Sequence, residues 1–373
     1  MKNGGFMRFL KAFTCLLPAA AALLLFFLLP FFPGFAEIAV TGGIFRLLSA
    51  PLGMLTSLLP FSLTEIAVVA AVPALILLTV LFVRHMRRSA NRKRTAGRAV
   101  KAAGWTLSLL LLAYMLLHGL NFDRRPAAEL MELDVSPKSA AFLQQVTGDL
   151  ARLASREREG LSEDDDGCAV LSEPLDDTLS RAGEGYRVLQ GDYSFLWGTV
   201  NRAKPVVLSH WWSYTGITGV YFPFFNEANI NRDVPASGIP ATAAHELAHT
   251  RGFAREDECN FFAYLSCVSH PDAEYRYSGY LLAYTLCANA LYDYDADRWR
   301  EASAFCSEGM RRDIVQNNDY WKRFEGQIQQ LSSAVNDSFL EAQGDPDGVL
   351  SYDRAVSLIL AWYQSEELLE SAD

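Results

Sequence analysis

Three long apolar runs dominate the first third of the chain, covering residues 9–35, 63–83 and 103–120. Each has close to the ~20 residues that an α-helix needs to cross a hydrocarbon layer of ~30 Å. Surface helices of globular proteins carry a polar stripe, and these runs carry none. The pattern therefore predicts a transmembrane region of three helices within residues 1–121.

Positive charge predicts how these spans are oriented. Eight Lys and Arg residues lie in residues 84–101, between the second and third runs, and short basic loops of this kind lie on the cytoplasmic side. Lys2, Arg8 and Lys11 place the N-terminus on that side too. We expect a multi-pass protein of the cell membrane whose residues 122–373 are extracytoplasmic. Cleavage of the first run as a signal peptide, before Glu37, is an alternative that leaves this topology unchanged.

Residues 122–373 have the mixed composition of a globular domain. An amphipathic helix is expected at residues 139–157, and two aromatic-rich, strand-like stretches begin at Lys204 and Gly219. Pro223 cannot donate a ladder hydrogen bond, so the second strand is expected at or near a sheet edge. From Ile239 onward the pattern is almost wholly helical. We therefore predict a mostly helical α+β domain with a small sheet.

Charge and cysteine content narrow the kind of partner. The formal net charge of −10 belongs mainly to the second part of the chain, because the first part is basic. An acidic domain argues against nucleic acid as a partner, since neutralising phosphates needs clustered Lys and Arg. The six cysteines form no CxxC pair, so a cysteine zinc site is not expected.

The stretch "PATAAHELAHTRG" contains the strongest chemical signal, an HExxH motif. On a helix, His245 and His249 share one face, where both imidazoles can reach the same metal ion. Glu246 then lies beside them as the general base that activates a water on that metal. Gly252 follows three residues after His249, where a glycine can end the helix in a left-handed turn.

A third metal ligand is expected from the helix that begins in "EDECNFFAYL". Glu256 shares one helical face with Asn260 and is the favoured ligand. Asn260 would then hydrogen-bond a ligand and fix its orientation. Glu258 is the alternative ligand, and Asp257 ranks third.

The motifs resemble those of known families. "HELAH" followed by "ExxCNxxA", with Glu256, Cys259, Asn260 and Ala263 in place, is similar to the gluzincin zinc metallopeptidases. The fuller pattern, with "GVYFPFFNEANIN" and the spans before it, resembles an uncharacterised bacterial membrane family, domain of unknown function 3810. The resemblance implies a zincin-like fold that binds one zinc ion. The chain departs from most gluzincins in its short spacing, with only six residues between His249 and Glu256.

The predicted function is that of a membrane-anchored zinc metallopeptidase that hydrolyses peptide bonds in peptides or in the cell envelope. The lipid bilayer is the other expected partner, and the strand from Val220 to Phe224 is expected to bind an extended peptide by strand addition. A donor to the developing oxyanion is also needed. The candidates are His210, His270, Tyr277 and Tyr280.

Two other functions fit the same motif. In one, a zincin-like domain senses an external ligand with little or no hydrolysis, and the spans transmit the signal. In the other, the substrate is a non-peptide amide. Glu246 favours chemistry over sensing, because a zinc site with a purely structural role has no use for that carboxylate.

Overall fold

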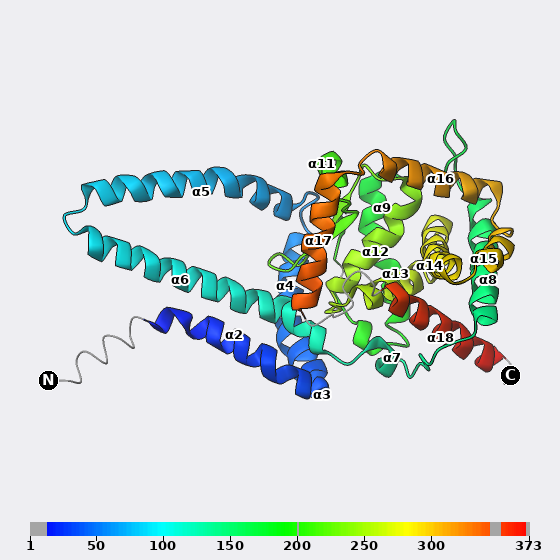
Figure 1. Cartoon of the computed structure of the whole chain (residues 1–373), viewed down its shortest axis with the longest axis horizontal. Coiled ribbons are helices and arrows are strands. Elements are labelled where there is room, and N and C mark those ends of the chain that lie inside the picture. Colours follow the sequence, from blue (N-terminus) through cyan, green and yellow to red (C-terminus); the bar gives the residue numbers. More distant parts are fainter. Residues whose placement is uncertain (1–12, 200, 344–351, 371–373) are drawn as a thin grey trace.

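The computed structural model describes residues 13–199, 201–343 and 352–370. Long helices project from one side of a mostly helical globular domain, and the last described helix, residues 352–370, lies on that domain (Figure 1). Residues 9–12 of the first predicted span, and the basic residues Lys2, Arg8 and Lys11, lie outside the described residues.

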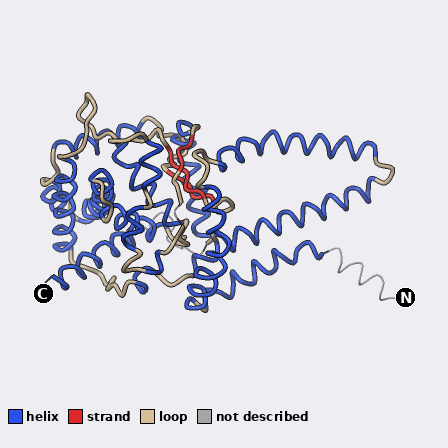
Figure 2. The backbone as a smooth tube through the Cα atoms, turned by 180° about the vertical axis from the view of Figure 1, so that it is seen from behind, coloured by secondary structure: helices blue, strands red, loops and turns tan. Residues whose placement is uncertain are grey.

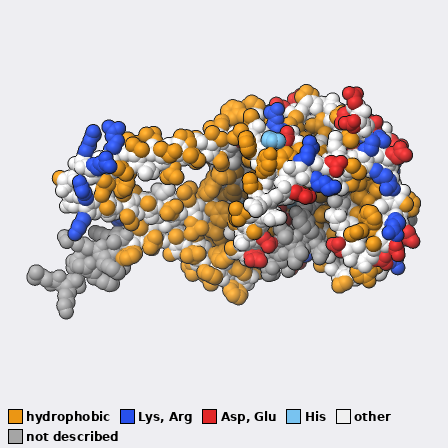
Figure 3. Space-filling view, turned by 45° about the horizontal axis from the view of Figure 1, so that its top comes forward, with side chains coloured by type: hydrophobic (Ala, Val, Ile, Leu, Met, Phe, Trp, Pro, Cys, Tyr) orange, Lys and Arg blue, Asp and Glu red, His pale blue; other side chains and the backbone are white. Residues whose placement is uncertain are grey.

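Three of the projecting helices are α2 (Leu17–Leu28), α5 (Leu63–Arg88) and α6 (Arg92–Leu117). α2 packs against α6, and both run toward the domain, whereas α5 runs away from it (Figures 1 and 2). The apolar surface of α5 is wholly unburied within the structure. The basic residues cluster at the tip where α5 turns into α6, far from the domain (Figure 3).

A fourth apolar helical segment, Pro33–Thr56, joins α2 to the turn before α5. It comprises α3 (Pro33–Phe35), the π-helical η3 (Ala36–Phe45) and α4 (Arg46–Thr56). In the part of the chain that the structure describes, four helices are long and apolar enough to cross a membrane, rather than the three predicted. This fourth segment runs crosswise to the other three, along the domain (Figures 1 and 2).

The polar side chains of the fourth segment explain why the sequence pattern missed it. Glu37, Thr41 and Arg46 interrupt its hydropathy, and each has a partner near or in the domain. Arg124 binds the Glu37 carboxylate at 2.7 Å, and Thr41 Oγ1 donates to Asn121 Oδ1 at 2.9 Å. Arg46 donates to a backbone carbonyl of the domain at 3.0 Å. Residues 36–56, which lie outside the three predicted spans, are therefore helical and anchored along one side of the domain.

The domain contains one three-stranded sheet. Its strands are β1 (Lys204–Val206), β2 (Gly219–Phe222) and β3 (Glu227–Asn231), in the order β1-β3-β2. β1 is parallel to β3, and β2 is antiparallel to it, with Val220 opposite Asn229. β2 is therefore an edge strand of this sheet, as Pro223 predicted.

Helices make up the rest of the domain. The predicted helix 139–157 is α8 (Ala140–Arg158), and the region after Ile239 is mostly helical as expected. The other domain helices are α7 (Ala127–Leu130), α9 (Leu175–Arg181), α10 (Glu184–Leu189), α11 (Ser209–Ser213), α12 (Ile239–His249), α13 (Glu256–Val268), α14 (Ala273–Tyr294), α15 (Ala296–Ser303), α16 (Glu308–Lys322), α17 (Gln327–Ala342) and α18 (Tyr352–Glu370). Short turns of helix are η1 (Thr14–Leu16), η2 (Leu29–Phe31), η4 (Gly119–Asp123), η5 (Ser194–Leu196) and η6 (Ala236–Gly238).

The core is built around α12 and α13. Ala243, Ala244 and Ala248 are fully buried, and these small side chains let α12 pack closely against β2 and β3 on one side and α13 on the other. Almost every residue of α13 is buried, Phe261 and Phe262 completely. The HELAH motif is therefore held inside the domain by rigid neighbours on both sides.

A buried polar seam joins the domain to the start of α5. Lys204 and Glu227 form an ion pair with both side chains almost inaccessible to solvent. Glu227 also accepts from Thr64 N at 2.9 Å and Thr64 Oγ1 at 2.7 Å, so its carboxylate caps the first turn of α5. Lys204 Nζ donates to the Thr56 carbonyl, the last residue of α4, at 2.7 Å. The ion pair therefore holds the end of α4 and the start of α5 against the sheet.

Replacing Lys204 with Met tests this seam. The change leaves the Glu227 carboxylate buried without its cation, and we expect a loss of about 3–5 kcal/mol in stability. Thermal unfolding of the full chain in detergent measures it. The matched control is Arg300→Met in the exposed Arg300–Asp297 pair, where we expect a change of no more than about 0.5 kcal/mol. Equal effects of the two changes would contradict the structural role of the buried pair.

Candidate metal centre

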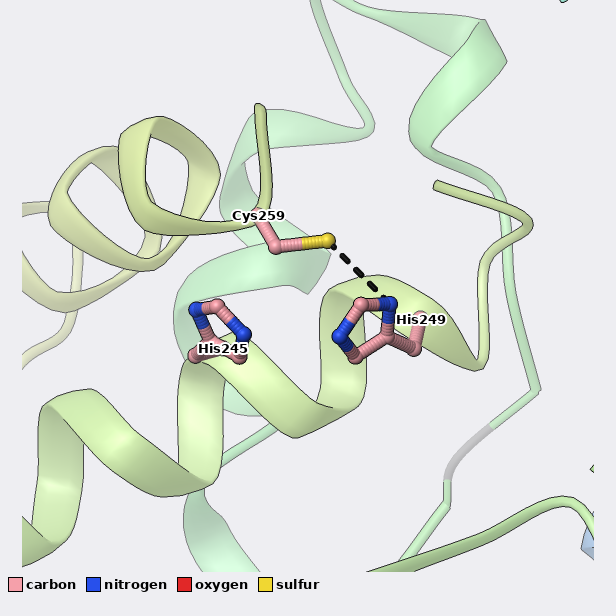
Figure 4. A group of neighbouring side chains, drawn as sticks. All are labelled: His245, His249 and Cys259. Carbon is pink, nitrogen blue, oxygen red and sulfur yellow. Dashed lines mark hydrogen bonds between the residues drawn. The ribbon is translucent and has the colours of Figure 1, made fainter. Parts of the chain in front are cut away.

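α12 presents the two histidines of the motif on one face. Their ring centroids are 5.1 Å apart, and one nitrogen of each ring points into the space between the rings (Figure 4). α12 ends at His249, and Gly252 has the left-handed φ of +82° that the sequence predicted. A Cβ at Gly252 would lie 2.8 Å from Thr41 Cγ2, so this turn also packs tightly against η3.

Glu256, the first residue of α13, brings its carboxylate to both rings. Its Oε2 lies 3.0 Å from His245 Nε2, and its Oε1 lies 3.6 Å from His249 Nε2. Ligand atoms about 2.0–2.1 Å from one zinc ion in tetrahedral geometry lie about 3.4 Å apart. The two observed distances lie on either side of this value, with a different carboxylate oxygen facing each ring, so Glu256 is placed to share a cation with both histidines.

Hydrogen bonds to the far side of each ring fix which nitrogen faces the centre. His249 Nδ1 donates to the Phe253 carbonyl at 2.8 Å, and because a carbonyl only accepts, this nitrogen carries the hydrogen. His245 Nδ1 lies 2.8 Å from Asn260 Oδ1. Both contacts turn Nε2 of each ring toward the centre, which is how metal-binding histidines are usually oriented. Asn260 therefore holds a ring in place, as expected from its helical position.

The charges of these groups are strongly coupled. Burial opposes protonation of His245, but its hydrogen bond to Glu256 and the charges of Glu256 and Glu246 raise its pKa to about 9. Burial also opposes ionisation of Glu256, yet the hydrogen bond from His245 and the nearby imidazoles lower its pKa to about 2. A proton shared by His245 and Glu256 thus occupies the position that a cation would take.

Glu246 lies beside this cluster, under the edge strand. Burial raises the pKa of its carboxyl to about 8, although His245 and a hydrogen bond from the Tyr221 backbone N–H act in the opposite direction. A Cβ at Gly219 would lie 2.6 Å from Glu246 Oε1. The strand can therefore approach this carboxylate only because residue 219 is glycine.

Cys259 offers another combination of ligands. One ligand atom from each of His245, His249 and Cys259 lies within 4.8 Å of the other two (Figure 4). However, Cys259 Sγ lies 3.4 Å from His249 Nδ1, the nitrogen that already donates to Phe253. Burial and the neighbouring carboxylates also raise the pKa of Cys259 well above its usual value, which disfavours the thiolate that binds metals. Glu256 is therefore the better third ligand.

The other two carboxylates of the helix start are engaged elsewhere. Glu258 Oε1 accepts from the Ala127 backbone N–H at 2.8 Å and from Arg255 at 3.0 Å. Asp257 pairs with Arg354 at 3.2 Å. Neither has a contact with the two histidines, so the alternatives to Glu256 serve to hold α13 against its neighbours.

The four candidate oxyanion donors do not lie with the metal ligands. His210 is exposed and contacts Asp233 at 3.2 Å. Tyr277 donates to Asp313 at 2.6 Å. His270 stacks on Tyr275, and Tyr280 lies against Tyr264. His210 lies on α11, Tyr277 and Tyr280 lie on α14, and His270 follows α13, so nearness in sequence to the motif was a poor guide.

The structure instead brings His118 to the site. This residue ends α6, and its ring centroid lies 5.8 Å from that of His249 and 5.6 Å from that of Tyr221. Tyr221 stacks on His249 at 5.7 Å and donates to Asn226 Oδ1 at 3.0 Å. His118 lies within the third predicted span, residues 103–120, and was not among the site residues predicted from the sequence. The missed signal was an ionisable side chain in an apolar span, which commonly marks a functional site.

The choice of third ligand can be tested by metal content. We expect Glu256→Gln to lower zinc affinity by at least about 100-fold, more than the about 10–100-fold typical for a group that only orients a ligand. Metal analysis of the full chain after dialysis against a zinc buffer measures it. Glu258→Gln keeps an oxygen for the Ala127 N–H and should bind zinc normally. Zinc lost with Glu258→Gln and retained with Glu256→Gln would reverse the assignment.

Comparisons with known proteins extend over most of the chain. A family model described as "Protein of unknown function (DUF3810)" matches residues 41–360. No curated protein matches the chain, and no solved structure does. The match includes the crosswise segment from Thr41, both helices α5 and α6, and the entire candidate metal centre. Because it covers far more than half of the sequence, the chain belongs to the family of proteins of unknown function DUF3810.

Proposed function

We propose that this protein is a membrane-anchored zinc metallopeptidase of the gluzincin type, with a zincin-like domain that hydrolyses peptide bonds. The observation that supports it best is the position of the Glu256 carboxylate, whose oxygens lie 3.0 and 3.6 Å from the inward-facing nitrogens of His245 and His249. A purely structural zinc site would have four protein ligands. Here the carboxylate of Glu256 is the most exposed of the three, about 35% accessible, which leaves one side open to substrate.

The reaction divides between the ion and the protein. A zinc ion bound there supplies Lewis-acid chemistry, polarising a carbonyl and lowering the pKa of water to about 7. Glu246 takes the proton from the attacking water and passes it to the leaving amine. Its position beside the two histidines and against β2 suits a group that moves a proton between these two steps. Asn260 and the Phe253 carbonyl keep both imidazoles in the orientation that binding requires.

The edge strand β2 offers a track for an extended peptide. Asn231 N donates to the Thr218 carbonyl, so in this antiparallel ladder Val220 and Phe222 also pair with β3. The peptide groups of Gly219 and Tyr221 consequently point toward the opposite edge, the one beside Glu246. A substrate strand added at that edge would lie along the carboxylate that performs proton transfer.

His118 is the residue placed to stabilise the oxyanion in this proposal. Its ring lies against His249 and Tyr221, and it also interacts electrostatically with Glu256. An imidazole N–H beside the metal ligands can donate to a carbonyl oxygen as negative charge develops on it. No other histidine of the described residues contacts the two histidines of the motif.

The charge distribution supports one orientation in the membrane. The basic turn between α5 and α6 is at the tip farthest from the domain (Figure 3), and α2 starts on the side of that tip. We place the tip and the N-terminus in the cytoplasm and the catalytic domain outside the cell. In this arrangement α2, α5 and α6 cross the bilayer, and the crosswise segment Pro33–Thr56 lies along its outer surface.

A sensing role is the second candidate, and the contact between α6 and the metal centre favours it. A ligand bound at the metal would press on His118 and thereby on a helix that reaches the cytoplasmic side. This role gives Glu246 no function. The two candidates therefore differ in what happens when Glu246 loses its charge.

Glu246→Gln separates the two candidates. In the peptidase, the variant keeps its zinc but loses about 10²–10⁴-fold in hydrolysis of a peptide library, because the general base is gone. The full chain in detergent is assayed beside Glu308→Gln, an exposed glutamate on α16 that should leave the rate unchanged. Equal turnover by the wild type and Glu246→Gln would exclude the mechanism. Zinc bound without any turnover by the wild type would favour sensing.

His118→Ala tests the oxyanion role. We expect unchanged zinc content, a kcat reduced by about 10²–10³-fold and a nearly unchanged KM, because the donor acts on charge that develops only in the transition state. His85→Ala, at the basic end of α5, is the matched histidine control. Loss of zinc from His118→Ala would make this residue a ligand instead, and an unchanged kcat would remove it from the mechanism.

A further inference from the structure

Helix α17 carries an apolar stripe that nothing in the described chain covers. Ile328, Leu331, Val335 and Phe339 recur every three or four residues and are 59%, 68%, 63% and 40% exposed. A spacing of this kind places them on one face of the helix. The helix is not loosely attached, because Leu340 is buried against Phe122 and Ala254 of the domain.

The stripe is long enough to lie between the domain-side ends of two predicted spans. At the C-terminal end of α17, the Phe339 ring lies 6.5 Å from that of Tyr114, in the last turn of α6. At its other end, Gln329 packs beside Gly216, in the loop after α11. Just before α11, the backbone of residues 207 and 208 donates to Glu65 in the first turn of α5. α17 therefore crosses from the start of α5 to the end of α6.

Other apolar side chains are exposed at the same level. Trp211 on α11 is 68% exposed, and Val207 beside it is 71% exposed. On the crosswise segment, Ile38 and Leu47 are 78% and 75% exposed. Figure 3 shows hydrophobic side chains continuing from the projecting helices onto the near part of the domain, whereas acidic side chains gather farther away. Tryptophan is typical of the level where a bilayer meets water.

We propose that α17 lies in the headgroup region of the bilayer that the spans cross, and that it holds the metal centre at the membrane surface, where the site takes peptide segments anchored in that same bilayer. The second half of this inference rests on the proposed peptidase function. The first half rests on the stripe alone.

A bilayer fits this surface better than a protein partner does. The stripe lies between the start of α5 and the end of α6, and the long exposed apolar surface of α5 has the length and composition of a membrane span. It also runs parallel to the plane defined by the ends of the spans, as an interfacial helix does. Its neighbouring face, with Gln330 and Glu341 exposed, is polar and would remain in water.

The position of the site selects the substrate. His118 is the residue that ends α6, and its ring touches His249 of the candidate centre. The bond to be cut must therefore come within a few side-chain lengths of the hydrocarbon edge. A peptide tethered by a lipid or by its own span is concentrated at that depth, whereas a freely soluble peptide is not.

Probe quenching tests the position of α17 without any assumption about catalysis. A fluorophore is attached to Leu331→Cys or to Gln330→Cys in the full chain, reconstituted in phosphatidylcholine–phosphatidylglycerol vesicles. The six native cysteines are buried, so labelling is selective. We expect lipids with a nitroxide near the headgroup to quench the probe at residue 331 several-fold more than the probe at residue 330. Equal quenching at the two positions would overturn the proposal.

Hydrolysis tests the substrate class. The vesicle-bound enzyme receives one random-sequence peptide library in two forms, palmitoylated or acetylated, and the palmitoylated form should be cleaved several-fold faster. Leu331→Asp should reduce this preference, and Gln330→Asp should preserve it. Equal cleavage of both forms would refute the anchored substrate. Cleavage of neither form would refute the peptidase function, while the quenching result would still decide where α17 lies.

Discussion

The Glu256 carboxylate lies between two imidazoles, and its hydrogen bond with His245 and the nearby imidazoles favour its ionised form. The rest of the site depends on that arrangement. α12 must be straight and buried to hold His245 and His249 one turn apart, and the left-handed turn at Gly252 must bring α13 back within reach. Asn260 and the Phe253 carbonyl then fix the rings. A cluster so organised is suited to exchange its shared proton for a divalent ion.

The crosswise segment Pro33–Thr56 and the end of α6 help to form this centre. Arg124 donates to the Gly252 carbonyl at 3.0 Å while it pairs with Glu37, so the turn after His249 is tied to the crosswise segment. Tyr221 joins the same structure, because its hydroxyl contacts both Asn226 and the carbonyl of Leu117 at the end of α6. Residues from the apolar helices and from the sheet thus surround the two histidines of the motif.

The local parts of this picture could be predicted from the sequence, and the long-range parts could not. The four-residue repeat of the histidines, the glycine turn and the long apolar helices are encoded by neighbouring residues, so hydropathy and spacing suffice to find them. His118 meets His249 across 131 residues of chain, and no local pattern records such a contact. The hydropathy pattern did not predict segment Pro33–Thr56 as a fourth apolar helix, because its polar residues gain their partners only in the folded domain. His270 and Tyr277 lie close to the motif in sequence, yet their partners are Tyr275 and Asp313.

The seam around Lys204 and Glu227 has a practical consequence for anyone who would detach the domain from its helices. A fragment beginning at Phe122 would lack Thr56, Leu63 and Thr64, and it would leave a buried ion pair short of four of its hydrogen bonds. It would also lack Glu37 and Thr41, which brace the turn after His249. The helices of this protein are therefore not a tether that can be exchanged for another. They are part of the folded structure that surrounds His245 and His249.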